Sequence, residues 1–286
     1  MTALRAGALA LAALTLGAPG AGAAPSSLPT VASGARPGPD LLYAPAPDAP
    51  QLDNAAPWKA EPILVSGAEA YRDGEFLYQD FLFDDHGATG PADDPNDPFN
   101  QVENMFSAKH GTLSYPTDTA TFLNNAADLV ELRVKPLADA TALRVTLNSL
   151  KDPSRTAFTV ALGDSPAAVP WPHGANVRSP AQLFLTVHGT TAELLDAATG
   201  KPLAPAPAAT VDLTRRQIDV RIPHAAWSPG SATVRMAAGV GLWDTTANTY
   251  LQPGPTATAT TPGGAAAANA ALFNMAFRTN EPVPHI

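Results

Sequence analysis

Alternation of apolar and polar side chains runs through most of residues 130–277, and it constrains the fold more than any other feature of the chain. Val130, Leu132 and Val134 are separated by charged residues, and the same period of two recurs in 143–147, 158–162, 183–187, 218–222, 234–242 and 273–277. Successive side chains of a strand point to opposite faces, so each stretch is predicted to be a strand with one buried face. About ten such strands without a long helical pattern predict an all-β, antiparallel β-sandwich with minor helix.

The first 23 residues have the features of a secretory signal peptide. A positively charged start precedes an apolar run from Ala6 to Leu16, which is too short to span a membrane. Ala21-Gly22-Ala23 then provides a small-residue cleavage site. The protein is therefore expected to be secreted, with residues 1–23 removed.

The remaining chain divides by composition into a spacer and one folded domain. Residues 24–57 are rich in proline and alanine and lack apolar periodicity, which predicts a disordered spacer. The β-sandwich is expected over residues 58–286, with a low-complexity surface loop at about 253–269.

Composition excludes several classes of function. The chain has no cysteine, so disulfides cannot stabilise it in an oxidising compartment. Its formal charge of -9 is unsuited to nucleic acid, which requires a positive surface, but is compatible with cation binding. After the signal peptide, no apolar run approaches the length of a membrane span.

An aromatic stretch that begins at Tyr71 leads into acidic residues before Gly90, which predicts a strand that delivers carboxylates to a loop. Six to eight oxygen ligands at flexible geometry are typical of Ca²⁺, and a cation would offset the repulsion between gathered acids. The candidate ligands are Asp84, Asp85, Asp93, Asp94, Asp97 and Asp118. Their spacing does not match an EF-hand, so any site is composed from several loops. The alternative is a solvated acidic loop that caps a sheet.

Five sequence blocks resemble a known family. They are Phe83-Asp84-Asp85-His86-Gly87, the Gly111–Asp118 stretch, Ala127–Val134, and the pair formed by Gly239–Asp244 with Phe273–Arg278. In these blocks the chain resembles the glucodextranase C-terminal domain-like, or DOMON-like, β-sandwiches related to family 9 carbohydrate-binding modules. The resemblance implies a jelly-roll type of sandwich that binds a polysaccharide or cell-wall glycan without catalysis.

Aromatic side chains are the candidates for sugar contact, because the C–H groups of a pyranose stack on aromatic rings while polar neighbours orient its hydroxyls. The predicted ligand-binding residues are Trp171, Tyr115 and Trp243. Trp171 lies in a proline-flanked loop, where an exposed platform is possible. Trp243 lies in a glycine-flanked strand, where packing in the core is the alternative.

No catalytic motif is present in the sequence. A Gly-x-Ser-x-Gly nucleophile elbow is absent, and Asp85 with Asp128 would need a suitable separation across a cleft to act as a glycosidase pair. The leading hypothesis is thus a secreted, calcium-stabilised module that binds carbohydrate or a cell surface. A second is the accessory domain of a secreted α/β-hydrolase whose catalytic domain is absent from this chain, since similar sandwiches resemble the front half of such proteins. A glycosidase is the third.

Overall fold

The computed structural model describes residues 54–87 and 111–276, where the chain is built from antiparallel strands, as the alternation predicts. The predicted signal peptide and most of the predicted spacer lie outside these residues. The strands are β1 Ala68–Arg72, β2 Glu75–Gln79, β3 Leu129–Pro136, β4 Ala140–Leu147, β5 Thr156–Leu162, β6 Val169–Pro170, β7 Arg178–Ser179, β8 Leu183–His188, β9 Thr191–Asp196, β10 Ala208–Asp212, β11 Gln217–Pro223, β12 Met236–Asp244, β13 Thr249–Tyr250 and β14 Leu272–Ala276. Helix in the described parts of the chain is limited to a 3-10 turn at Pro153–Arg155, and none of it could cross a membrane.

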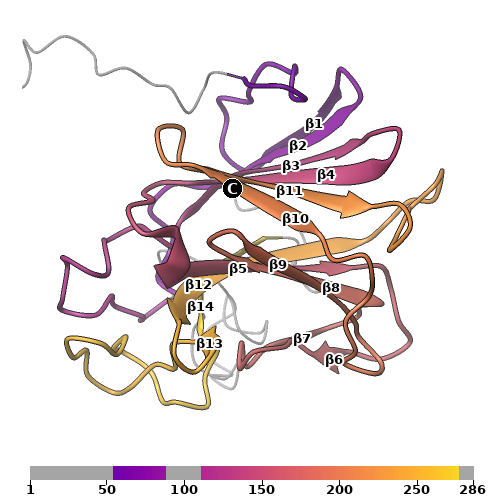
Figure 1. Ribbon diagram of the computed structural model, residues 1–286. Helices are drawn as coiled ribbons and strands as arrows, with labels where there is room; N and C mark the ends of the chain where they lie inside the picture. Colours follow the sequence, from indigo (N-terminus) through magenta and orange to yellow (C-terminus); the bar gives the residue numbers. More distant parts are fainter. Residues whose placement is uncertain (1–53, 88–110, 277–286) are drawn as a thin grey trace, which may run out of the picture. The chain divides into compact units, whose positions relative to one another are not determined.

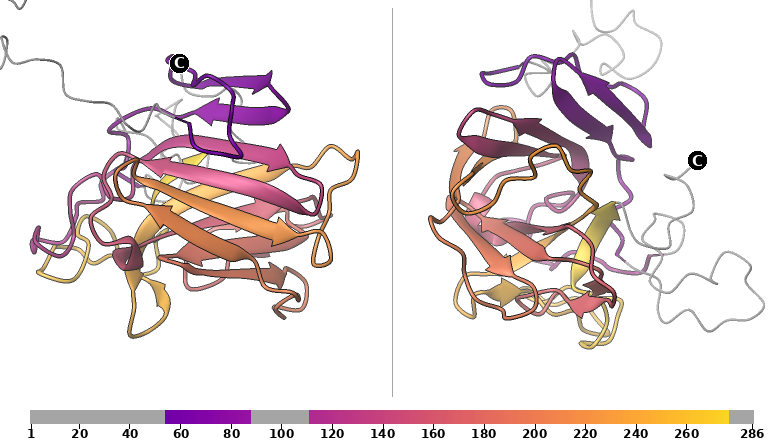
Figure 2. Two further views of the ribbon diagram at one scale, coloured as in Figure 1. Left: turned by 45° about the horizontal axis from the view of Figure 1, so that its top comes forward. Right: turned by 90° about the vertical axis from the view of Figure 1, so that its right-hand side faces the viewer.

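Two large sheets face each other as layers of a sandwich (Figure 1). Sheet I has the order β1-β2-β3-β4-β11-β10, and sheet II has the order β13-β12-β5-β8-β9, with β14 also paired to β12. Every one of these pairings is antiparallel, and the views in Figure 2 show the two layers from other sides. The short strands β6 and β7 form a separate ribbon.

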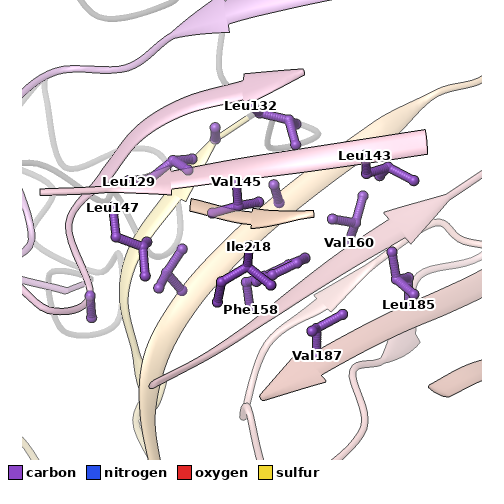
Figure 3. Close-up of a cluster of buried hydrophobic side chains, with 14 of the residues drawn as sticks. Leu129, Leu132, Leu143, Val145, Leu147, Phe158, Val160, Leu185, Val187 and Ile218 are labelled. Carbon is purple, nitrogen blue, oxygen red and sulfur yellow. The ribbon is translucent and has the colours of Figure 1, made fainter. Parts of the chain in front are cut away.

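The inner faces of the two sheets form the main hydrophobic core (Figure 3). Leu132 of β3 stands opposite Val145 of β4, and Phe158 of β5 stands opposite Val187 of β8. These side chains are at most 1% exposed. Complete burial of such a side chain contributes about 1.5–3 kcal/mol, so the alternating pattern is the principal source of stability.

The strand expected after Tyr71 is divided by a tight turn. Asp73 and Gly74 adopt positive φ values of 51° and 74° and connect β1 to β2 as a hairpin. Asp-Gly is a strong hairpin signal, because type I′ turns require two residues with positive φ. The turn places Tyr71 directly opposite Phe76.

The N-terminal segment, residues 54–66, packs on the outer face of sheet I. Trp58 is 3% exposed, and its indole Nε1 donates a hydrogen bond of 2.5 Å to Asp219 Oδ1 on β11. The Arg144 guanidinium lies 5.1 Å from the centre of the Trp58 ring, a cation–π distance. Lys135 Nζ donates to Pro57 O at 2.8 Å. The last residues of the predicted spacer are therefore bonded to the sheet.

A network of buried charges lies beneath the N-terminal segment. Glu75 pairs with Arg133 at 3.1 Å and with Lys135 at 2.9 Å. Glu131 pairs with Arg133 at 2.7 Å and with Arg144 at 3.1 Å. The side chains of Glu75, Arg133 and Arg144 are at most 1% exposed. Each charge thus depends on its partners to offset the loss of water.

Glu75 is the residue that joins this network to the N-terminal segment. Its Oε1 accepts hydrogen bonds from the backbone N–H of Lys59 at 2.7 Å and of Ala60 at 3.3 Å. Burial alone would raise the pKa of Glu75, but hydrogen bonds from Lys135, from this backbone and from Arg133 together hold that pKa below its ordinary value. Glu75 is therefore ionised at neutral pH.

We expect Glu75→Gln to destabilise the fold by about 3–5 kcal/mol, because it leaves the buried Arg133 and the partly buried Lys135 without their common carboxylate. Urea unfolding followed by tryptophan fluorescence measures the loss. The control is Glu69→Gln on the same hairpin, an exposed position where a change within about 0.5 kcal/mol is expected. Equal effects of the two substitutions would contradict a structural role for the network.

Candidate functional site

A loop that carries Asp84 and Asp85 follows β2 and is bonded to both sheets. Asn274 of β14, in sheet II, donates from Nδ2 to Asp84 Oδ1 at 2.6 Å. The backbone N–H of Phe83 donates to Asp128 Oδ2 at 2.8 Å, and Asp128 directly precedes β3 of sheet I. The acidic block predicted from the sequence therefore joins the two layers at one end of the sandwich.

Asp85 and Asp128 lie close enough to repel each other and are 2% and 0% exposed. The Tyr115 hydroxyl donates to Asp85 Oδ2, and Asn148 Nδ2 donates to Asp128 Oδ2 at 2.8 Å. Asp128 Oδ1 has no hydrogen-bond partner in the described parts of the chain. Burial raises the pKa of Asp85, and it raises the pKa of Asp128 to about 6 against the hydrogen bonds from Phe83 and Asn148. Both carboxyl groups are buried within the part of the chain that the structure describes, whereas the two carboxyl groups of a glycosidase flank a bound substrate.

A close approach of two backbone segments brings Tyr115 to this acid pair. The Leu113 N–H donates to His86 O at 2.7 Å. A Cβ atom on Gly111 would lie 2.3 Å from His86 O and 2.4 Å from Gly87 O, so only glycine fits there. The Gly111–Asp118 block therefore begins with glycine because no larger side chain fits at position 111.

Within the described residues, no other predicted calcium ligand is placed at this loop. Asp118 Oδ1 accepts from the backbone N–H of Ala120 and Thr121 at 3.1 and 3.3 Å, so it caps its own turn. Asp93, Asp94 and Asp97 lie outside the described residues. Within 54–87 and 111–276, no group of three or more acidic or histidine side chains could hold a metal ion. These residues alone do not supply the shell that Ca²⁺ requires.

Two of the three predicted sugar-binding aromatics lie in a second core on the outer face of sheet II. Trp171 is 4% exposed, and its indole Nε1 donates to Ser179 Oγ at 2.9 Å. Trp243 is 0% exposed and stacks on His188 with ring centres 4.5 Å apart. Neither ring has a face open to a ligand. Tyr115, the third, is partly buried and uses its hydroxyl within the acid cluster.

Small residues on sheet II make room for two rings of this second core, those of Trp171 and Tyr250. A Cβ atom on Gly239 would lie 3.2 Å from Trp171 Cζ3, and one on Gly241 would lie 2.8 Å from Tyr250 Cδ1. The outer face of β12 thus leaves room for rings that would otherwise be exposed. The proline-flanked loop of Trp171 turns inward to fill that space.

The structure instead presents a groove with aromatic walls, where the inner faces of β2, β3 and β4 extend to one edge of the sandwich. Its volume is about 420 Å³. The aromatic walls are Tyr71, Phe76 and Trp227, and Val234 and Met236 supply aliphatic contacts. Tyr71 is 80% exposed, and its ring centre lies 5.1 Å from that of Phe76. The groove therefore contains an accessible ring pair.

The groove presents almost no charge. Of the described residues that line it, Glu75 alone is acidic or basic, and its carboxylate is bound to Arg133 and Lys135 on the opposite face of sheet I. Thr141 also lines the groove, and its buried hydroxyl oxygen has no hydrogen-bond partner among the described residues. This combination of apolar rings and a free hydroxyl suits an uncharged ligand that carries its own polar groups.

Sequence reasoning missed Tyr71 and Trp227 as members of one site. Tyr71 belongs to the stretch for which the sequence predicts a single strand that leads into an acidic loop. Trp227 follows β11 in a turn where its backbone N–H donates to Pro223 O at 3.1 Å. The two residues are 156 positions apart, as 227 − 71 shows, so no local spacing relates them. The Asp73-Gly74 hairpin signal was the one available indication that Tyr71 faces Phe76.

Comparisons with known proteins show no family for this chain. No protein-family model and no curated protein sequence matches this chain. Two chains among the solved structures match it, and one is a family 9 carbohydrate-binding module from Caldicellulosiruptor kristjanssonii in complex with cellotriose. The identity is 14%, the match covers 70% of this chain and 93% of that one, and the TM-score is 0.24. A similarity at this level carries no argument about what this chain binds.

The raised pKa of Asp128 predicts an unusual pH dependence of stability. A carboxyl with a pKa of about 6 in the folded state and 3.8 when unfolded favours folding below about pH 4, and this contribution is lost as pH rises through 6. Between pH 4.5 and 7.5 the folded state loses up to about 2 kcal/mol of stability. Asp128→Asn cannot ionise and should remove this part of the pH dependence. The free energy of unfolding in urea, measured at several pH values with a chelator present, tests this prediction.

Asp118→Asn is the matched control for this experiment. Hydrogen bonds from Thr121 lower the pKa of Asp118, so its contribution is present at neutral pH and is lost as pH falls. The two substitutions should therefore change the pH slope in opposite directions. An Asp128→Asn variant with the wild-type slope would show that Asp128 does not titrate near pH 6.

Proposed function

We propose that this chain is a non-catalytic carbohydrate-binding module and that the groove between Tyr71 and Trp227 holds a neutral sugar chain. The observation that carries the proposal is the accessible aromatic groove. Tyr71 and Phe76 stand opposite each other on β1 and β2, so their rings are held on a rigid hairpin. Trp227 approaches from a different part of the chain.

The chemistry of the groove favours a sugar over a charged ligand. Pyranose faces expose C–H groups that pack on aromatic rings, and their hydroxyls need hydrogen-bond partners. Thr141 provides a hydroxyl at the base of the groove, and the backbone near Gly230 borders it. A charged ligand would lose its water without gaining a partner charge. The proposal agrees with the family resemblance of the acidic and Tyr-Pro-Thr blocks.

Export and calcium binding are further parts of this proposal. Export is supported by the signal-peptide composition of residues 1–23. Calcium binding is supported by the acid-rich loop, in which Asp85 lies close to Asp128, whose Oδ1 has no hydrogen-bond partner among the described residues. A cation would relieve the repulsion in this loop, provided that acids of residues 88–110 complete the shell.

Sugar binding is tested by isothermal titration with soluble gluco-, xylo- and manno-oligosaccharides. We expect at least one neutral oligosaccharide to bind, and Tyr71→Ala and Trp227→Ala each to weaken it by about tenfold or more, as for buried aromatic contacts elsewhere. Leu213→Ala removes an exposed apolar side chain that does not line the groove, and it should leave affinity unchanged. Binding that is unaffected by both aromatic substitutions would place the sugar elsewhere.

Calcium binding is tested by thermal unfolding at pH 7.5 with CaCl₂ or with a chelator. We expect calcium to raise Tm, because a bound ion stabilises the folded state in proportion to its affinity. Asp85→Asn should abolish the increase, whereas Asp164→Asn, an exposed carboxylate on another loop, should retain it. The same Tm with and without calcium would exclude a calcium site of useful affinity and leave the sugar proposal untouched.

A further inference from the structure

A second pocket of about 230 Å³ lies apart from the aromatic groove and shares no residue with it. It is bordered by Gln79 at the end of β2, by Thr146 and Asn148 at the end of β4, and by Arg216 in the turn before β11. The N-terminal segment contributes Leu64 to its rim. With Val130 of β3, the pocket therefore combines residues from five separate parts of the chain.

Among the described residues that line this pocket, Arg216 is the only one with an ionisable side chain. Its Nη1 donates to Asn148 O at 2.5 Å, which holds the guanidinium beside the end of β4. A guanidinium has five N–H donors in a planar fork that matches a carboxylate, so one such bond leaves donors for a ligand. The pocket thus differs from the aromatic groove in presenting a positive charge.

Neutral polar groups surround this charge. Asn148 donates from Nδ2 to Asp128 Oδ2 at 2.8 Å, which orients the amide. Thr146 is 2% exposed, and its hydroxyl oxygen has no hydrogen-bond partner in the described parts of the chain. Leaving a buried hydroxyl unpaired is unfavourable, so a ligand that supplies a partner would relieve it.

The rim of the pocket is apolar and accessible. Leu64 is 78% exposed and Leu82 is 47% exposed, and both line the opening. An inorganic anion would leave these side chains in water. A ring with C–H faces would cover them, and its substituents would reach the polar groups below.

We propose that this pocket binds a sugar acid, a pyranose that carries one carboxylate. The carboxylate pairs with Arg216, the ring packs between Leu64 and Leu82, and the hydroxyls meet Gln79, Asn148 and Thr146. The site is separate from the neutral-sugar groove, so the chain has two sugar sites of different charge.

The test is titration of the full chain with D-glucuronate, D-glucose and inorganic phosphate, followed by NMR. Glucuronate should bind saturably and at least about tenfold more tightly than glucose or phosphate, because a charge-assisted hydrogen bond contributes this much. Arg216→Gln should weaken glucuronate by about tenfold or more. Tyr71→Ala should leave glucuronate affinity unchanged, which separates this site from the groove.

Thr146→Val covers the case in which Arg216→Gln impairs folding. Because the Thr146 hydroxyl has no partner in the described residues, the variant should keep or raise Tm while glucuronate affinity falls severalfold. The proposal is overturned if glucuronate shows no saturable binding, if glucose or phosphate binds as tightly, or if Tyr71→Ala abolishes binding and Arg216→Gln does not.

Discussion

Burial of two apolar faces against each other is the interaction on which the rest of this structure depends. The inner sides of β3, β4 and β11 meet those of β5, β8 and β12, and most of the buried aliphatic side chains belong to this layer. The layer sets which side of each strand faces outward. It thereby decides which residues remain to be covered by loops, paired as charges or used for binding.

The two outer faces are covered by different means. Sheet II presents glycine and alanine, and Trp171, Trp243 and Tyr250 fill the space above them. Sheet I presents Arg133 and Arg144 with acidic partners, and the N-terminal segment covers them. Burial of charge is costly without partners, which explains why Glu75 binds Arg133, Lys135 and two backbone N–H groups.

The two proposed binding sites lie where the surfaces of sheet I are left uncovered. At one edge, the inner faces of β2 and β3 extend to the aromatic groove, where the nearest carboxylate points away. Beside the end of the N-terminal segment, a smaller pocket is open to Arg216 and to neutral polar groups. The first site suits an uncharged ligand and the second suits an anionic one, because a charge buried without a partner is costly.

The sequence by itself determined the fold class, since a period of two specifies half-buried strands whatever they pair with. It also marked the acidic loop, and Asp85 with Asp128 do lie close together. Only the tertiary structure decided which aromatic rings are accessible. Trp171 is buried against Gly239 and Trp243 against His188 and Tyr250, all from other parts of the chain than the ring they cover, while Tyr71 and Trp227 meet at one groove across 227 − 71 = 156 positions. Exposure and charge pairing depend on neighbours from other strands, and no local pattern records those neighbours.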